Sequence, residues 1–406
     1  MRSKPLYPAG IDLGSSRTRC VISVLEDGHL RFLGASSVPS SGWHKGRLAD
    51  PGEVSMSIAR AVREAETNAQ VLVESAVLGM GGATIEGIEG RGIYEFGRAQ
   101  TLTSEDLSYA VNRASMGHMG DDRMLLHVMA QDFILDGQAG YRYPVGDRCA
   151  RLEANALLVT TSIREHQSLV AAAHHAHVAV DETVFEPVAG AYAAVLAEQR
   201  DNGTAVVDIG MHSSGIAIYD GESLVGAASI PVSADHFTRD LVLCLRAVHG
   251  VAISYEDAEA LKREHGSALR DPSSENTLVE VPSSDRHQSY TVTRGQIIEI
   301  LKDRAEELFH YVRRELRRSG MDRSLMEGVF LTGGGARLGG LPDAAESILK
   351  CRAQFGIAVG IEDWPENFDD PAWTTVAGLC MYAARLKMRK PVRRRAPNPF
   401  SLLGHR

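Results

Sequence analysis

Cysteine is scarce in this sequence, and its few copies are scattered. The 406 residues include five cysteines that form no C-x-x-C pair: Cys20, Cys149, Cys244, Cys351 and Cys380. This spacing argues against both a disulfide framework and a zinc site. We therefore expect the protein to work in a reducing compartment.

Long apolar runs are also missing. No stretch approaches the roughly 20 apolar residues that a helix needs to cross a bilayer, and residues 1–8 lack the apolar run of a signal peptide. Charged residues make up 23% of the chain and hydrophobic residues 44%, as in ordinary soluble proteins. We expect a protein that stays inside the cell, and its length predicts two or three domains.

Acidic residues are absent after Asp370, although the whole chain has a formal net charge of −9. The negative total disfavours binding to nucleic acid. Basic residues instead crowd the end of the chain: Arg385, Lys387, Arg389, Lys390, Arg393, Arg394 and Arg395. This asymmetry predicts that the tail alone contacts an anionic surface.

What the sequence does contain is an internal duplication. Residues 10–39 and residues 206–231 each show an apolar strand ending in Asp-x-Gly, a polar loop, a second strand, an Asp-Gly turn and a third strand. Asp-Gly between apolar runs predicts a hairpin, because its turn needs the positive φ angles that these residues tolerate. The two copies are separated by far more than the about 20–50 residues of a solenoid repeat. We therefore predict two copies of one domain.

Two such domains would place their Asp-x-Gly loops opposite each other across a cleft. Glycines let the backbone approach phosphate oxygens, and successive N–H groups form an anion-binding concavity. The carboxylates of Asp12 and Asp208 can hold magnesium through water. A single Asp-x-Gly is more often a plain hairpin, so the predicted phosphate site depends on the pair.

Two further segments fit such a site. Residues 329–341 (VFLTGGGARLGGL) combine an apolar strand with three glycines and a second glycine pair. Bare backbone of this kind lets a flat ring lie against it, although a glycine-rich link between a strand and a helix has the same pattern. Residues 184–199 are predicted to pass from a strand into a helix with Pro187 in its first turn.

These segments together resemble the actin, Hsp70 and sugar-kinase superfamily. Five of its signatures occur in order: the first phosphate loop (10–20), the first connecting helix (184–196), the second phosphate loop (205–218), the adenosine motif (329–341) and the second connecting helix (370–383). Within the superfamily the sequence is most similar to the FtsA family, because residues 121–146 resemble its specific subdomain. The resemblance covers residues 9 to about 385, nearly the whole chain.

The resemblance implies an α/β fold of duplicated actin-like (RNase H-like) domains around a nucleotide cleft, with an FtsA-type inserted subdomain. The implied boundaries are 1–80 and 166–200 for subdomain 1A, 81–165 for the FtsA-specific subdomain 1C, 201–232 and 321–365 for subdomain 2A, 233–320 for subdomain 2B, 366–386 for the second connecting helix, and 387–406 for a basic linker and membrane-targeting tail.

A site for ATP and Mg²⁺ is also implied by the resemblance. The positions that match the family's nucleotide contacts are Asp12, Gly14, Ser15, Ser16, Arg17, Asp208, Gly210, Ser213, Glu259, Lys262, Gly333, Gly334, Gly335 and Arg337. Asp12 and Asp208 would hold the metal through water. Glu186, which would orient the attacking water, and Asp208 would support at most slow hydrolysis. Without the family, Glu186 can equally face solvent, and Glu259 with Lys262 can be a surface pair on one helical face.

The second phosphate loop departs from the family's pattern. Relatives usually read Asp-x-Gly-Gly-Gly-Thr, whereas Gly210 is followed here by Met211, His212 and Ser213. Side chains at 211 and 212 restrict φ and can crowd the terminal phosphate, and Gly215 stands where an acidic residue is often present. Weakened nucleotide binding, or a scaffold that binds no nucleotide, therefore stays open.

Partners follow from the same resemblance. Arg294 and Arg304 match basic contacts to the acidic C-terminal tail of the tubulin-like protein FtsZ, although they can also pair within this chain or stay in water. Residues 80–165 would bind other division proteins, and the chain would assemble with itself into a filament. Phe400, Leu402 and Leu403 would form a short membrane anchor, helped by basic residues, unless the tail is simply disordered.

The sequence thus predicts a division protein that binds ATP, self-assembles and tethers FtsZ filaments to the cytoplasmic membrane at the septum. The alternatives are a cytoplasmic actin-like adaptor of a pilus or secretion system, a nucleotide-free scaffold, and a small-molecule kinase. The kinase requires a general base near a sugar pocket, for which the sequence offers no clear candidate.

Overall fold

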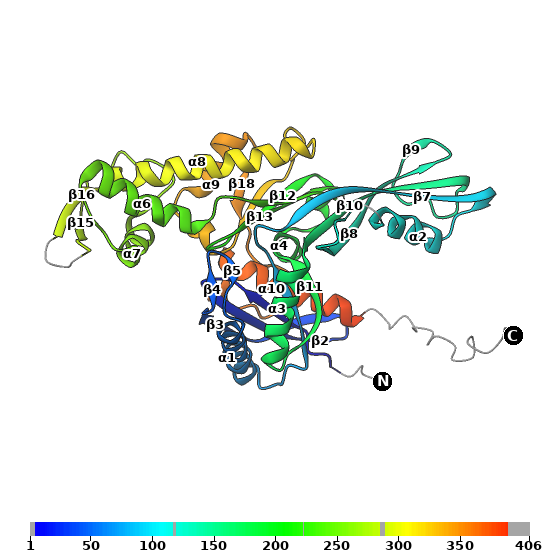
Figure 1. The fold of residues 1–406 in the computed structure, drawn as a ribbon, viewed down its shortest axis with the longest axis horizontal. Coiled ribbons are helices and arrows are strands. Elements are labelled where there is room, and N and C mark those ends of the chain that lie inside the picture. Colours follow the sequence, from blue (N-terminus) through cyan, green and yellow to red (C-terminus); the bar gives the residue numbers. More distant parts are fainter. Residues whose placement is uncertain (1–4, 117–118, 222, 285–288, 389–406) are drawn as a thin grey trace.

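Two large β-sheets built on the same plan form the framework of the molecule (Figure 1). The computed structural model describes residues 5–116, 119–221, 223–284 and 289–388. The first sheet contains β1 (Ala9–Leu13), β2 (Arg17–Glu26), β3 (His29–Pro39), β6 (Ser75–Met80) and β11 (Ala179–Phe185). The matching part of the second contains β12 (Thr204–Ile209), β13 (Ser214–Asp220), β14 (Ser223–Ile230), β17 (Gly328–Thr332) and β18 (Ala353–Phe355).

The strand orders confirm the predicted duplication. The first sheet runs β11-β6-β1-β2-β3, and the second begins β18-β17-β12-β13-β14. In both, the first two pairings are parallel and the last two antiparallel. The hairpin between β2 and β3 turns at Asp27 and Gly28, whose φ angles are 50° and 89°. The Asp-Gly signal therefore marked the turn correctly.

An arm between β6 and β11 extends the second sheet (Figure 1). It contains β7 (Glu86–Thr101), α2 (Ser104–Ser115), β8 (Arg123–Leu135), β9 (Gln138–Tyr141) and β10 (Arg148–Ser162). Strand β7 pairs with β14 at Glu86 and Ala228, so this inserted subdomain continues the sheet of the second half. Helix α2 lies directly on β7, since a Cβ at Gly92 would be 1.9 Å from the carbonyl oxygen of Ala110.

A second arm lies on the opposite side in Figure 1. It contains α6 (Ala234–His249), α7 (Tyr255–His265), β15 (Leu278–Pro282), β16 (Ser289–Thr293) and α8 (Arg294–Arg318). The predicted apolar stripe of α8 is buried throughout: Ile298, Leu301, Ala305, Leu308, Val312 and Leu316. This stripe packs α8 against the core of the second half, as its helical spacing predicts.

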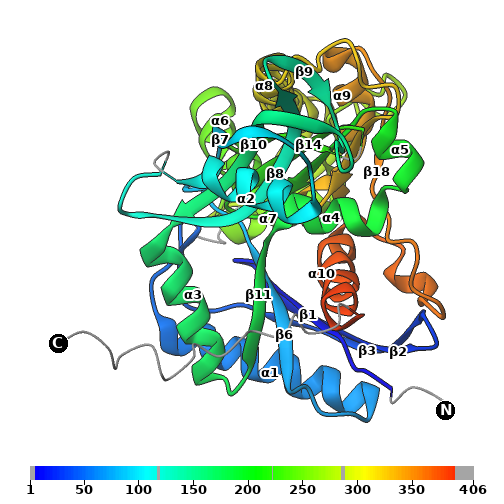
Figure 2. The same cartoon turned by 90° about the vertical axis from the view of Figure 1, so that its right-hand side faces the viewer.

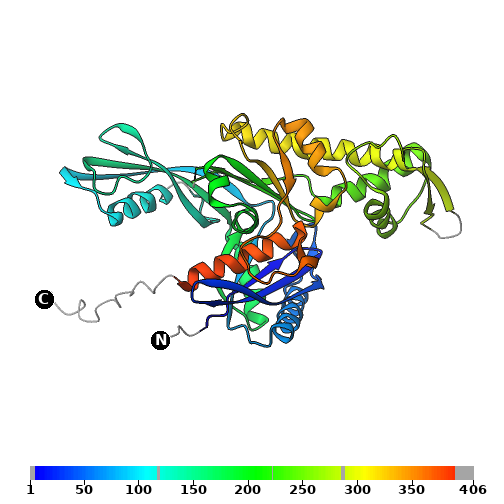
Figure 3. The same ribbon diagram turned by 180° about the vertical axis from the view of Figure 1, so that it is seen from behind.

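Two helices connect the halves: α4 (Glu186–Ala194) and α10 (Pro371–Met388). They cross closely, because a Cβ at Gly378 would lie 1.8 Å from the carbonyl oxygen of Ala189. Helix α10 also lies against the first sheet (Figure 3), where a Cβ at Gly10 would be 2.5 Å from the amide nitrogen of Cys380. Any change in the angle between the halves must therefore move this crossing.

Helix α10 continues two residues beyond 386, where the linker was expected to begin, and Lys387 pairs with Asp181 at 3.7 Å. The predicted membrane residues Phe400, Leu402 and Leu403 lie outside the described residues. Within the described part of the chain, no helix is long and apolar enough to cross a membrane.

The remaining elements cover the sheets. Helices α1 (Pro51–Ala69) and α3 (Ile163–His175) lie on one side of the first sheet and α10 on the other (Figure 2). The short strands β4 (Trp43–His44) and β5 (Arg47–Leu48) form a hairpin before α1. The others are α5 (Ala197–Asp201), α9 (Leu341–Leu349) and two 3₁₀ turns, η1 (Gly334–Arg337) and η2 (Glu366–Phe368).

Candidate functional site

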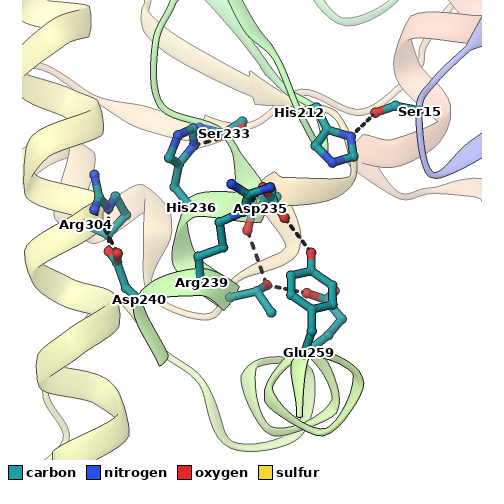
Figure 4. A network of polar contacts seen from close by, with 12 residues as sticks. Ser15, His212, Ser233, Asp235, His236, Arg239, Asp240, Glu259 and Arg304 are labelled. Carbon is teal, nitrogen blue, oxygen red and sulfur yellow. Dashed lines mark hydrogen bonds and ion pairs between the residues drawn. The ribbon is translucent and has the colours of Figure 1, made fainter. Parts of the chain in front are cut away.

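The two Asp-x-Gly loops have the same backbone geometry and face each other. A Cβ on Gly14 would lie 2.8 Å from the carbonyl oxygen of Arg17, and one on Gly210 would lie 2.7 Å from that of Ser213. Both turns therefore require glycine. The loops also touch across the halves, because Nδ1 of His212 is 2.9 Å from Oγ of Ser15 (Figure 4).

Three predicted carboxyl groups gather at these loops: Asp12 at the end of β1, Asp208 at the end of β12 and Glu186 at the start of α4. Burial raises the pKa of Asp12 to about 6, with Arg19 lowering it and Asp208 raising it further. Burial, followed by the charges of Asp12 and Asp208, raises the pKa of Glu186 well above its usual value. A cation placed among these groups would lower all three pKa values.

The carboxylate of Asp208 is hydrogen-bonded to residues of two different elements, β17 and α10. Its carboxylate accepts a hydrogen bond of 3.0 Å from Thr332 at the end of β17 and a short one from Thr375 on α10. Burial raises the pKa of Asp208, and these two threonine hydroxyls oppose the shift. The second connecting helix is thus bonded directly to a candidate magnesium residue.

Arg19 is a site residue that the sequence analysis missed. Its Nη1 lies 3.3 Å from Oδ2 of Asp12, its side chain is only 11% exposed, and its guanidinium lies over the ring of Trp373. Its Nε is buried and has no hydrogen-bond partner within the described residues. A buried cation with an unused donor, next to a glycine turn, suits a phosphate group.

The duplication itself holds the signal that could have identified Arg19. In the first hairpin Asp12 pairs with Arg19, and in the second Asp208 pairs with Gly215. The two positions are therefore equivalent. The second hairpin has no room for a side chain at this position, because a Cβ on Gly215 would lie 2.9 Å from Cγ of Pro187 at the start of α4.

Arg17 has a different setting from the one expected for a phosphate ligand. Its Nε donates to Oγ of Ser37 at 2.8 Å, and its Nη2 donates to the carbonyl oxygen of the same residue. Burial, followed by the charges of Arg19, Arg263 and Arg337, lowers the pKa of Arg17. Each of those three neighbouring arginines is itself paired with a carboxylate, so the region carries charges of both signs. A role for Arg17 itself stays a prediction.

The glycine-rich loop after β17 lies directly behind the second phosphate loop. A Cβ at Gly333 would be 2.7 Å from Oδ1 of Asp208, and one at Gly335 would be 2.5 Å from Cγ2 of Ile209. A Cβ at Gly334 would meet no atom of the described chain within 4 Å. This leaves bare backbone facing open space beside the loop, as expected for an adenosine contact. The neighbouring Arg337 pairs with Asp370 through two nitrogens, at 2.7 and 2.8 Å.

The remaining predicted nucleotide contacts bond to each other. Glu259 and Lys262 on α7 form an ion pair of 2.6 Å, and Nζ of Lys262 also donates to the carbonyl oxygen of Ala234 and to Oγ1 of Thr238. These bonds fix α7 against α6. A contact of either side chain with ribose or adenine stays a prediction.

Both predicted FtsZ contacts are also paired within the chain. Arg304 binds Asp240 through two nitrogens, at 2.5 and 2.9 Å, and contacts Glu307. Arg294 donates to the carbonyl oxygen of His265 at 3.1 Å. The internal pairing that the sequence left open is thus present in the structure.

A cavity of about 420 Å³ opens beside the first phosphate loop and Glu186. It brings together six residues of the two loops and α4 that the sequence analysis discussed: Asp12, Gly14, Ser15, Glu186, Met211 and Ser213. The rest of its wall comes from distant segments, including Trp43 and Arg47 of the β4–β5 hairpin and Arg164 of α3. No pattern in the sequence links those segments, so this part of the site could not be predicted.

The carboxyl groups fit a magnesium ion held mainly through water. Among the described residues, no group of three or more His, Cys, Asp or Glu side chains is arranged to hold a metal directly. Mg²⁺ usually keeps several of its waters and uses one or two carboxylates together with substrate phosphates. Asp12 and Asp208 at the two glycine turns supply that set.

Glu186→Gln is expected to stabilise the ligand-free protein at pH 8 and to have little effect at pH 5. Because the folded-state pKa of Glu186 is raised, the folded chain binds more protons than the unfolded chain above pH about 4, and stability falls as the pH rises. The amide of Gln does not ionise, so the variant does not lose this stability as the pH rises. The melting temperature at pH 8 should rise by about 1 °C for each kcal/mol recovered, since the entropy of unfolding scales with the 406 residues of the chain.

Glu198→Gln, on the exposed surface of α5, provides the matched control. Its melting temperature should equal that of the unsubstituted protein at both pH values. An equal effect of Glu186→Gln at pH 5 and pH 8 would contradict the assignment of a buried, proton-holding carboxyl.

Comparison with known proteins places this architecture among cell division proteins. The family model described as cell division protein FtsA matches residues 205–378, and the model of the SHS2 domain inserted in FtsA matches residues 82–160. The chain is 29% identical to cell division protein FtsA of Pseudomonas aeruginosa, covering 92% of this chain and 88% of the relative. It is 27% identical to that of Bacillus subtilis, covering 95% and 85%.

Solved structures confirm the predicted actin-like fold. The PilM–PilN type IV pilus biogenesis complex matches with a TM-score of 0.64 at 17% identity, covering 93% of this chain and 98% of that one. MreB5 of Spiroplasma citri bound to ADP matches with a TM-score of 0.58 at 13% identity, covering 95% and 98%. The matched inserted domain also confirms that an FtsA-type subdomain interrupts the first half.

Proposed function

Because this chain belongs to the FtsA family of cell division proteins, we propose that it binds ATP and Mg²⁺ between its two halves and tethers FtsZ filaments to the cytoplasmic membrane at the septum. The observation that carries the proposal is the pair of equivalent glycine turns, with Asp12 and Asp208 beside them, facing each other across the connecting helices. A relative in fold, MreB5 of Spiroplasma citri, has been solved bound to ADP and to AMPPNP.

The phosphates would lie between the two turns. Backbone N–H groups after Gly14 and Gly210 would donate to them, and the unused Nε of Arg19 would supply positive charge. The adenine ring would lie against the open backbone at Gly334. Bound Mg²⁺ would neutralise the phosphates, while Asp12 and Asp208 hold its water ligands.

Hydrolysis would be slow and would depend on Glu186. This side chain lines the cavity beside the first loop, and no charged partner is bonded to it in the described part of the chain. Burial and the charges of Asp12 and Asp208 raise its pKa, and a bound cation would lower that pKa again. It can then orient a water molecule toward the terminal phosphate, so that nucleotide state acts mainly as a switch.

The switch would act through the crossing of α4 and α10. Asp208 is bonded to Thr375 on α10, and α4 begins with Glu186, so both connecting helices carry groups of the nucleotide site. A ligand that pulls on these groups changes the angle between the halves. We propose that this angle selects the form that assembles into filaments, while the arm of residues 80–165 binds other division proteins.

FtsZ would be recognised by charge. The acidic C-terminal tail of FtsZ would compete with Asp240 and Glu307 for Arg304, which binds Asp240 through two nitrogens and whose side chain is 23% exposed. Arg294, paired at 3.6 Å with the half-exposed Asp271, offers a second exchangeable cation. On binding, Arg304 and Arg294 would thus exchange carboxylates of this chain for carboxylates of FtsZ.

Removal of residues 389–406 is expected to abolish the tethering of FtsZ filaments to vesicles that contain anionic lipid. The deleted segment holds six Lys and Arg residues, each worth about 1 kcal/mol near an anionic surface, and the apolar residues Phe400, Leu402 and Leu403. The measurement is flotation of FtsZ filaments with vesicles in the presence of the chain and ATP. The deleted segment begins after the last residue of α10, Met388, so its removal should leave the melting temperature unchanged.

Vesicles without anionic lipid provide the control for charge. Unchanged flotation after the deletion would contradict the membrane anchor and favour an adaptor of a pilus or secretion system. Flotation of the chain without FtsZ would contradict the dock and leave the anchor standing.

A further inference from the structure

His212 occupies the position in the second phosphate loop that Ser16 occupies in the first. Instead of a small residue, the second loop therefore carries an imidazole at its tip. The side chain points across the cleft, where its Nδ1 lies 2.9 Å from Oγ of Ser15 (Figure 4). This hydrogen bond joins the two halves of the molecule at the place where both loops would meet a phosphate.

The backbone that carries His212 is held firmly. The amide of Ala234 donates to the carbonyl oxygen of Gly210 at 3.0 Å, and that of Asp235 donates to the carbonyl oxygen of Met211 at 2.8 Å. Behind the side chain, a Cβ at Gly46 would be 3.1 Å from Cβ of His212, so the β4–β5 hairpin packs closely against it. The backbone of the loop is therefore fixed in place, and the imidazole side chain is the part that can rotate.

A single phosphate oxygen that accepts hydrogen bonds from both Ser15 and Nδ1 of His212 cannot coexist with the present contact between them. A phosphate oxygen that accepts from Ser15 and from His212 at about 2.8 Å each holds the two donors roughly 4.5 Å apart. The observed separation is 2.9 Å. Binding in this arrangement separates Ser15 from His212, and both groups then donate to the ligand.

We propose that His212 is a phosphate ligand that exchanges its hydrogen bond with Ser15 for one to the terminal phosphate of the bound nucleotide, and that it makes this bond as an imidazolium. The proposal rests on the proposed function, since it needs a nucleotide between the loops. It adds His212 to the nucleotide contacts, and it adds protonation of the imidazole on binding, which makes the affinity for nucleotide depend on pH.

The surroundings of His212 determine whether its imidazole is protonated before and after the phosphate binds. The groups that face the imidazole are Asp235, Arg239 and His236 of α6 and His44 of β4. Burial lowers the pKa of His212; Asp235 opposes the shift, and Arg239, His236 and His44 add to it. The imidazole is therefore neutral in the free protein at pH 7. A phosphate in contact with it favours the charged form, so nucleotide binding takes up a proton.

The test compares ATP binding by the full chain and by His212→Asn, with Mg²⁺ present, at pH 6 and pH 8. An asparagine amide can still bond to Ser15, but it cannot take up a proton. Hydrogen bonds to charged groups predict roughly tenfold weaker binding for the variant at pH 6, with the ratio falling toward one at pH 8. The titration of ATP itself is common to both proteins and cancels in this ratio.

Calorimetry in buffers of different ionisation enthalpy gives the second readout. The unsubstituted chain should take up more protons on binding ATP at pH 7 than His212→Asn does. His310→Asn, which changes an exposed histidine on α8, should bind and take up protons like the unsubstituted chain. The assignment of His212 would be overturned if the affinity of His212→Asn differed from that of the unsubstituted chain by the same factor at pH 6 and pH 8, and if both proteins took up the same number of protons. ATP binding itself would then remain. Absence of binding by the unsubstituted chain would overturn the nucleotide site and this inference together.

Discussion

Asp208→Asn is expected to weaken the binding of Mg²⁺-ATP by at least about a hundredfold while leaving the chain folded. The amide keeps the size of the side chain and an oxygen for Thr332 and Thr375, whose hydroxyls hold Asp208 in place. It loses the negative charge that holds the water ligands of the metal. A hundredfold loss corresponds to about 2.7 kcal/mol, within the range for a hydrogen bond to a charged group.

Asp220→Asn is the matched control, because it removes a carboxylate from the exposed end of the same hairpin. Asp220 pairs with Arg142 at 3.9 Å on the surface, where such pairs contribute little. Titration calorimetry should find the affinity of Asp220→Asn unchanged. Binding by Asp208→Asn within a few-fold of the unsubstituted chain would contradict the magnesium role of Asp208.

Gly378→Ala is expected to lower the free energy of unfolding by about 2 kcal/mol or more. Two effects oppose each other: alanine favours an isolated helix by about 1 kcal/mol over glycine, but its methyl group would lie 1.8 Å from the carbonyl oxygen of Ala189. The steric effect dominates, because α10 and α4 would have to move apart and lose packing on both sides. Thermal unfolding followed by circular dichroism measures the change.

Gly334→Ala is the comparison for this substitution. A Cβ at Gly334 has open space around it, so the melting temperature should stay within about 1 °C of that of the unsubstituted chain. Its nucleotide affinity should fall, since the methyl group would stand where the adenine ring is expected. An unchanged melting temperature for Gly378→Ala would show that the helix crossing is looser than the structure describes.

The fold could be predicted because its signals are local and occur twice. Asp-x-Gly turns, Asp-Gly hairpins and a glycine run after a strand each report the conformation of a few residues, and their repetition indicates two copies of one domain. The stripe of α8 was readable for the same reason, since one face of a helix repeats along the sequence.

Arg19 was missed because its role depends on pairing across strands. Its neighbour Asp12 is seven positions away along the chain but directly opposite in the hairpin. The expected charge was assigned to Arg17, whose guanidinium instead bonds to Ser37. Counting the register of the predicted hairpin outward from its turn would have placed Arg19 beside the carboxylate.

The cavity wall and the end of α10 lay beyond sequence reasoning. Trp43, Thr84 and Arg164 come from the β4–β5 hairpin, the segment before β7 and the start of α3, which only the folded structure brings together. Lys387 was assigned to the linker because basic residues and prolines follow it, but α10 continues to Met388 and Lys387 pairs with Asp181. That His212 crowds the terminal phosphate stays a prediction, and its contact with Ser15 was not predicted, since that contact joins the two halves.

A structure of the chain with Mg²⁺ and a non-hydrolysable ATP analogue would test the central claim most directly. The predicted result is a triphosphate between the turns at Gly14 and Gly210, with the base against Gly334 and with Ser15 separated from His212. A nucleotide bound elsewhere, or bound while Ser15 and His212 remain in contact at 2.9 Å, would contradict it.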